Sequence, residues 1–89
     1  MNSNKNWGLK VRNKIYKLVS RFPKKDQERI INTIESLPIN PFEGDIEKMK
    51  GEENIWRRRV GAYRILYEII PQEKVIYVFR VERRTSKTY

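Results

Sequence analysis

The chain has 89 residues, enough for one small domain spanning residues 1–89. Twenty lysine and arginine residues against eleven acidic ones give a net charge of +9, which favours a polyanionic partner. Cysteine and histidine are both absent. Disulfides, thiolate metal sites and imidazole chemistry are therefore excluded, so any reaction must use Arg, Lys, Tyr, Glu or Asp. We expect no metal and no cofactor.

The chain also lacks the apolar segments that direct a protein to a membrane. Its apolar runs are a few residues long, too short for a transmembrane helix. The polar residues 1–6 do not resemble the apolar part of a signal peptide. We therefore expect a cytoplasmic protein without a membrane partner.

The first part of the chain predicts a short strand and two helices. Apolar and other residues alternate over residues 7–11, the period of a half-buried strand. Asn13 is a candidate cap for a helix whose apolar residues recur at helical spacing up to Phe22. Pro23 ends that helix or opens the next, which we expect over Asp26–Leu37. The short link between them predicts an antiparallel helical hairpin.

The second part of the chain predicts a loop and three strands. Proline, asparagine and glycine break regular structure before residues 42–54, which we interpret as a loop. Strands are expected over 55–60, 63–70 and 74–81, and the short turns between them indicate an antiparallel meander. Both faces of the last strand are apolar, which favours a central position. The predicted fold is α+β, with the N-terminal strand and the helical hairpin packed on a twisted antiparallel sheet.

The motif Trp56-Arg57-Arg58-Arg59-Val60 is the most informative stretch. Alternate side chains of a strand share a face, so Arg57 and Arg59 point away from Trp56, Arg58 and Val60. Arg64 on the next strand falls on the same face as Arg57 and Arg59. Like charges across a sheet are destabilising, and a phosphate would relieve the repulsion because the arginine fork donates in pairs to its oxygens. A merely solvated basic face is the alternative.

The apolar positions of these two strands make the complementary prediction. We expect Trp56, Ile65 and Tyr67 to be buried under the helices.

A second basic cluster closes the chain. It combines Arg83, Arg84 and Lys87 with the terminal Tyr89. A tyrosine can stack on a base or donate its hydroxyl. A solvated tail is the alternative interpretation.

The order of these features resembles the RelE/ParE toxin superfamily over nearly the whole chain. The resemblance is carried by Phe22-Pro23, Asn40-Pro41, Lys48-Met49-Lys50-Gly51, the stretch from Trp56 to Ile69, the stretch from Val81 to Arg84, and Tyr89. It implies a toxin of a type II toxin–antitoxin system that cleaves mRNA on the ribosome without a metal. The partners it implies are a cognate acidic antitoxin, the ribosome and mRNA.

The resemblance also implies roles for particular residues. Catalytic roles fall to Arg57, Arg59, Arg64, Arg84 and Tyr89, with Arg83 as a register alternative to Arg84. Glu47 resembles the glutamate that some relatives use as a general base. RNA contacts are expected from Lys48, Lys50, Arg83 and Lys87. Arg58 departs from the pattern, since relatives often have an apolar residue there, and it either disturbs burial or extends the basic patch.

Three functions stay open at this point. The first is the endoribonuclease. The second is a ParE-like toxin that inhibits DNA gyrase and has no nuclease chemistry, and the third is an inactive RNA-binding relative. Tyr89, together with the presence of both Arg57 and Arg59, favours the endoribonuclease.

Overall fold

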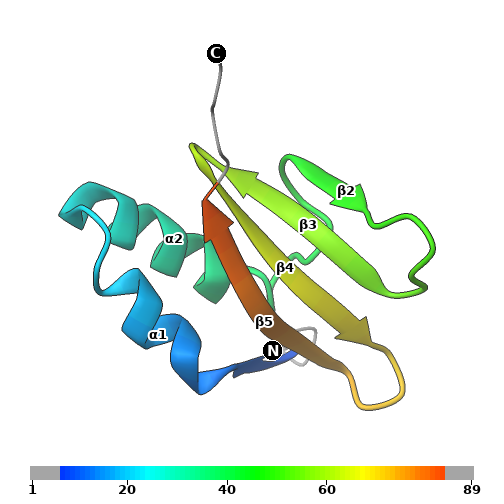
Figure 1. Ribbon diagram of the computed structural model, residues 1–89. Helices are drawn as coiled ribbons and strands as arrows, with labels where there is room; N and C mark the ends of the chain where they lie inside the picture. Colours follow the sequence, from blue (N-terminus) through cyan, green and yellow to red (C-terminus); the bar gives the residue numbers. More distant parts are fainter. Residues whose placement is uncertain (1–6, 84–89) are drawn as a thin grey trace.

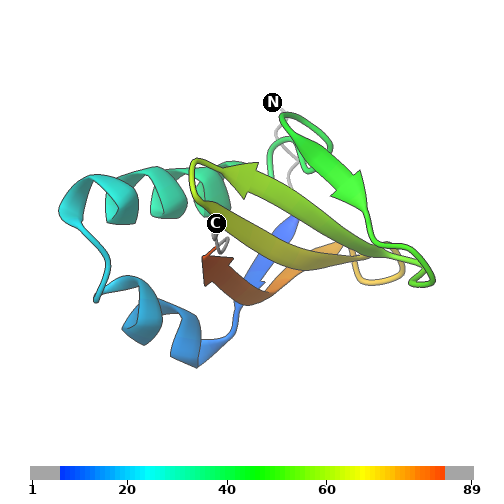
Figure 2. The same ribbon diagram turned by 45° about the horizontal axis from the view of Figure 1, so that its top comes forward.

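The computed structural model describes residues 7–83. The elements in chain order are β1 (Gly8–Val11), α1 (Asn13–Val19), α2 (Lys24–Ser36), β2 (Ile46–Lys48), β3 (Ile55–Val60), β4 (Tyr63–Ile70) and β5 (Val75–Arg83). The strands form one five-stranded sheet in the order β1-β5-β4-β3-β2. Both helices lie on one face of this sheet (Figure 1), and its strands twist relative to one another (Figure 2). The predicted α+β fold is confirmed.

The sheet differs from the prediction at both of its edges. The meander of β3, β4 and β5 is antiparallel, and β5 is an interior strand as its two apolar faces predicted. The N-terminal strand β1, however, pairs parallel with β5, so the sheet is mixed. Residues 42–54 were expected to be a loop, yet β2 forms inside them and pairs antiparallel with β3. Its three residues are too few for a strand period to show in the sequence, and pairing satisfies backbone groups at the edge of β3.

The helical hairpin is present with shifted boundaries. Asn13 is the first residue of α1 and Arg12 occupies the cap position without a side-chain hydrogen bond, so the prediction of an Asn13 cap is wrong. Pro23 occupies the cap position of α2, which begins at Lys24 rather than Asp26. The side chain of Gln27 donates to the carbonyl of Phe22 at 2.8 Å and thereby closes the link between the helices.

The core lies between the two helices and the strands β4 and β5. Its fully buried side chains are Ile30, Ile34, Leu37, Ile65, Tyr67, Ile76 and Val78. The predicted burial of Ile65 and Tyr67 is confirmed. Trp56 is only half-buried, so its predicted burial under the helices is wrong. Because β3 is next to the edge strand, Trp56 reaches only the margin of the core, where Phe42 packs edge-on against it at 5.6 Å.

Tyr67 gives a test of how the core holds the segment before β2. Its hydroxyl donates to the carbonyl of Pro41 at 2.6 Å, and burial raises the pKa of Tyr67 to about 12. Tyr67→Phe should lower the free energy of unfolding by about 1–2 kcal/mol, because the Pro41 carbonyl loses its donor. Urea denaturation measures this. Tyr77→Phe is the control, since the Tyr77 hydroxyl makes no hydrogen bond within residues 7–83; equal losses in both variants would refute the tether.

Candidate functional site

Three arginines meet on the sheet face opposite the helices. Strand pairing puts Arg59 of β3 directly across from Arg64 of β4, and Arg57 lies two residues from Arg59 on the same face. Together with Asp45 and Glu47 they line a small hollow of about 60 Å³. The predicted convergence of Arg57, Arg59 and Arg64 is confirmed.

Each of the three arginines has a carboxylate partner. Arg57 donates to Glu47. Arg59 Nε lies 3.6 Å from Asp45 Oδ2, and an Arg64 nitrogen lies 3.4 Å from Glu82 Oε1. The repulsion that we expected a phosphate to relieve is thus relieved by the protein itself. The carboxylates that pair with Arg57 and Arg59 are well exposed. Exposed ion pairs contribute about 0–1 kcal/mol each, so a phosphate can replace these two carboxylates at little cost.

The electrostatics of Glu47 bear on its predicted role as a base. The hydrogen bond and the charge of Arg57 lower the pKa of Glu47, and the charges of Arg59 and Arg64 act in the same direction. A carboxylate with a lowered pKa is ionised at neutral pH but accepts a proton poorly. While Glu47 is paired with Arg57 it is therefore a weak base.

A β-bulge in β5 adds Arg80 and Glu82 to this face. The register between β4 and β5 shifts at this point, which leaves Phe79 as an extra residue. Strict alternation from the buried Val78 would turn Arg80 and Glu82 towards the helices, whereas the bulge turns Val81 inward instead. Arg80 Nε then lies 3.0 Å from Glu82 Oε2. Sequence reasoning missed Arg80. The signal was the spacing of three between Val78 and Val81, which a regular strand does not allow.

The other predicted site residues lie apart from the arginine cluster. Lys48 pairs with Trp56 and so shares the opposite face of the sheet, while Lys50 is exposed in the turn after β2. The guanidinium of Arg83 lies 5.9 Å from the ring centroid of Tyr63, on the helix side, so Arg83 does not join the cluster as a substitute for Arg84. The predictions for Arg84, Lys87 and Tyr89 lie outside the described residues.

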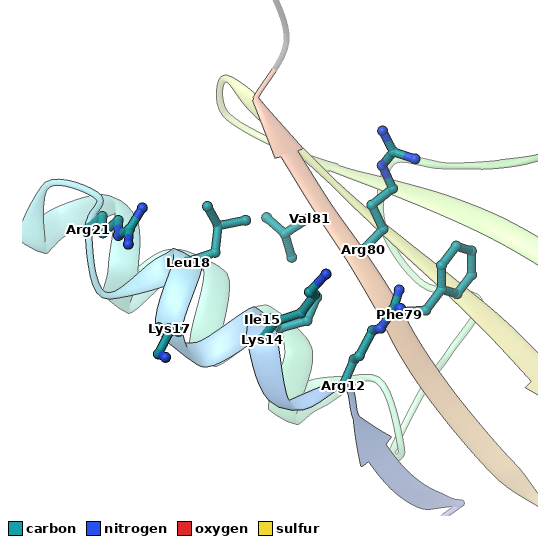
Figure 3. Close-up of a pocket in the computed structure, with 9 residues that line it drawn as sticks. All are labelled: Arg12, Lys14, Ile15, Lys17, Leu18, Arg21, Phe79, Arg80 and Val81. Atoms are coloured by element: carbon teal, nitrogen blue, oxygen red, sulfur yellow. The ribbon is translucent and has the colours of Figure 1, made fainter.

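A second, larger hollow separates α1 from β5. Figure 3 shows Leu18 of α1 and Val81 of β5 pointing towards one another across it. Its volume is about 500 Å³. The lining residues are Arg12, Lys14, Ile15, Lys17, Leu18, Arg21, Phe79, Arg80 and Val81. The α1/β5 groove, defined by these nine residues, therefore combines an apolar floor with five cationic side chains and no acidic one.

Within residues 7–83 there is neither a metal-binding cluster nor a membrane-spanning helix. Residues 7–83 contain no group of three or more acidic side chains placed to hold a metal ion. None of their helices is long and apolar enough to cross a membrane.

A helical hairpin on one face of a mixed sheet and a carboxylate-paired arginine cluster on the other define a small basic α+β protein. The family model described as the ParE toxin of the type II toxin–antitoxin system parDE matches residues 6–87. The chain belongs to this family, which is part of the RelE/ParE superfamily that the sequence resembles.

Three relatives illustrate the likeness. A Methanocaldococcus jannaschii protein bearing the toxin name RelE1 is 24% identical over 81 residues, covering 88% of this chain and 90% of that protein. In the RelE–RelB complex of Pyrococcus horikoshii, one chain matches with a TM-score of 0.79 and 23% identity over 92% of this chain and 99% of its own. A chain of the RelB–RelE complex from Methanococcus jannaschii matches with a TM-score of 0.70 and 31% identity, covering 86% and 92%.

Proposed function

We propose that this toxin is a ribosome-dependent endoribonuclease that cleaves mRNA without a metal. The observation that carries the proposal is the direct opposition of Arg59 and Arg64 beside Arg57, in a hollow whose counter-ions are exposed carboxylates. Such a cluster suits a phosphodiester, because guanidinium groups donate in pairs to phosphate oxygens. The similarity to proteins named RelE supports RNA as the molecule that contains this phosphodiester.

The chemistry needs both charge stabilisation and proton transfer. The 2′-oxygen attacks the adjacent phosphorus, a new P–O2′ bond forms and the P–O5′ bond breaks, leaving a cyclic phosphate. Arg57, Arg59 and Arg64 stabilise the negative charge that gathers on the phosphate oxygens. The proton of the 2′-hydroxyl must go to a base, and the leaving 5′-oxygen must receive a proton.

Arginine is always protonated and serves neither as the base nor as a ready acid. The proposal assigns the proton transfers to Tyr89 and Glu47. A phosphate that takes over Arg57 removes the contact that lowers the pKa of Glu47, so substrate binding makes Glu47 a better base. Arg84 adds a further positive charge. Lys50 and Lys87, together with Lys48 on the opposite face of the edge strand β2, are the proposed RNA contacts beyond the cluster.

The small size of the hollow supports the proposed dependence on the ribosome. A volume of about 60 Å³ accommodates a phosphate group but does not enclose a nucleotide. The protein can therefore bind the reacting group without aligning the attacking 2′-hydroxyl. Alignment is worth several powers of ten in rate, and the ribosome, which lies in the cytoplasm, supplies it. Free RNA should be cut poorly.

The deciding experiment runs two assays on the same purified protein. One follows cleavage of mRNA on programmed ribosomes by mapping the new 5′ ends, and the other follows supercoiling by DNA gyrase. We expect cleaved mRNA and active gyrase. Inhibited gyrase with intact mRNA would instead establish the ParE-like function, which the description of the family model favours. Binding to RNA without either effect would identify an inactive relative.

The proposed partner of the resting toxin is an acidic antitoxin that docks in the α1/β5 groove. The relatives from P. horikoshii and M. jannaschii are described as complexes of RelE with RelB. An amphipathic helix with acidic flanks complements this groove, because its apolar side meets Leu18 and Val81 while its carboxylates meet the five surrounding cations. The groove therefore favours docking of the antitoxin on the helical hairpin over docking on the arginine cluster.

A further inference from the structure

Arg58 is the one arginine of its motif that points away from the cluster. It lies on β3 between Arg57 and Arg59, and its guanidinium donates to the backbone carbonyl of Glu43 at 3.1 Å. Gly44 packs directly on that guanidinium, since a Cβ added there would lie 2.4 Å from the Arg58 Cζ. The Nε atom of Arg58 is buried without a hydrogen-bond partner in the described residues. The side chain is thus covered by the segment that precedes β2.

That segment carries the carboxylates of the arginine cluster. Asp45 follows Gly44, its backbone carbonyl accepts from the Arg59 N–H at 2.9 Å, and its carboxylate faces Arg59. Glu47, two residues further on, is paired with Arg57. Arg58 therefore contacts this segment from one face of β3. The same segment presents Asp45 and Glu47 to Arg59 and Arg57 on the other face.

The ion pairs on the cluster side contribute little to fixing this segment. The carboxylates that pair with Arg57 and Arg59 are exposed, and exposed ion pairs contribute little to stability. Strand β2 itself has only three residues. By contrast, the guanidinium of Arg58 is partly removed from water. This desolvation costs free energy that its contacts with residues 43 and 44 must offset. The φ of +93° at Gly44 brings the backbone close enough to cover the guanidinium.

We propose that Arg58 is a positioning residue for the arginine cluster: by holding residues 43–45 it places Asp45 and Glu47 where they orient Arg59 and Arg57 for an incoming phosphate. The placement of the carboxylates follows from the contacts alone. Only its consequence for cleavage rests on the proposed function.

The first test measures the pairing of Glu47 with Arg57 and needs no activity assay. The carboxyl titration of Glu47 is followed by NMR in the wild type, Arg58→Ala and Arg29→Ala. Because Arg57 lowers the pKa of Glu47, releasing the segment should move the titration of Glu47 to higher pH in Arg58→Ala. Arg29 is an exposed arginine of α2 near the turn at Gly61, so its loss removes the same charge without touching the segment. An unchanged Glu47 titration in folded Arg58→Ala would overturn the proposal.

Two further variants test the same prediction in case Arg58→Ala does not fold. Gly44→Ala leaves Arg58 in place but puts a Cβ into its guanidinium, and should produce the same shift of the Glu47 titration. Arg58→Lys keeps a charge without the flat group that Gly44 covers, and should produce a smaller shift in the same direction. Both variants with the wild-type titration would refute the positioning role.

The second test separates this inference from the proposed function. In ribosomal cleavage, Arg58→Ala should lower kcat about tenfold and change KM less than twofold, because the phosphate contacts remain while their alignment is lost. Arg29→Ala should match the wild type. If the wild type does not cleave mRNA, the proposed function fails and the Glu47 titration still decides the role of Arg58. If the Glu47 titration shifts in Arg58→Ala but kcat is unchanged, Arg58 positions the carboxylates without affecting catalysis.

Discussion

Arg64→Ala should lower the cleavage rate of ribosome-bound mRNA by about 10²–10³-fold, the usual effect of removing one donor to a developing charge. Arg64 stands directly across from Arg59 and lines the hollow where the phosphate is proposed to bind. Its partner Glu82 keeps a second arginine, Arg80. No carboxylate is therefore left unpaired by the change, and the free energy of unfolding should move by no more than about 0.5 kcal/mol.

Single-turnover cleavage on programmed ribosomes measures this effect, with urea denaturation of the same samples. Arg29→Ala is the matched control, because it removes an exposed arginine of α2 that does not line the hollow. Arg64→Lys should fall between the two, since it keeps the charge and loses the planar fork. Cleavage by Arg64→Ala within threefold of the wild type would show that the cluster is only a solvated basic face.

The arginine cluster could be predicted from the sequence because strand alternation is a strictly local rule. The spacing of Arg57 and Arg59 fixes their shared face whatever the rest of the fold does. The short turn to β4 then brings Arg64 beside them. Their carboxylate partners could not be predicted in the same way. Asp45 and Glu47 reach the cluster through the edge pairing of β2, a contact between segments about ten residues apart that leaves no period in the sequence.

The bulge in β5 sets a second limit on sequence reasoning. Strand alternation predicts the faces of β5 correctly up to Val78. After Val78 the bulge inverts the faces, so that Arg80 and Glu82 lie on the side of the arginine cluster and Arg83 lies on the helix side. The bulge is stabilised by tertiary packing, because it turns Val81 into the core. Which side chain is buried at this point depends on residues distant in the sequence, so local alternation does not predict it. The same tertiary competition leaves Trp56 half-buried beside the edge strand.

The α1/β5 groove was visible in the sequence only as scattered lysines and arginines on the first helix. They become one surface because β5 lies alongside α1 and contributes Phe79, Arg80 and Val81 to it. Leu18, which is 37% exposed, is one of the apolar side chains of this surface. An exposed apolar side chain that shares a groove with five cations is the arrangement expected of an interaction surface rather than of a solvated helix.

Leu18→Asp should therefore weaken antitoxin binding by about 30-fold or more, the effect of losing one central contact worth about 2 kcal/mol. The added carboxylate would also face the acidic helix proposed for this groove. The antitoxin is to be sought as a small acidic protein encoded beside the toxin gene, and calorimetric titration with this protein then gives the dissociation constant. Binding should also weaken as salt is raised, because the five cations of the groove carry part of the attraction.

Tyr16→Asp provides the control for this last prediction. Tyr16 lies on the same helix, is 49% exposed and does not line the groove, so the same change in charge there should reduce the affinity only slightly. Because Leu18 is partly exposed in the free toxin, neither variant should unfold it, which circular dichroism would verify. Equal affinity of Leu18→Asp and the wild type, with weakened binding in Arg57→Ala instead, would place the antitoxin over the arginine cluster. Direct occlusion of the phosphate site would then replace docking at the hairpin as the means of inhibition.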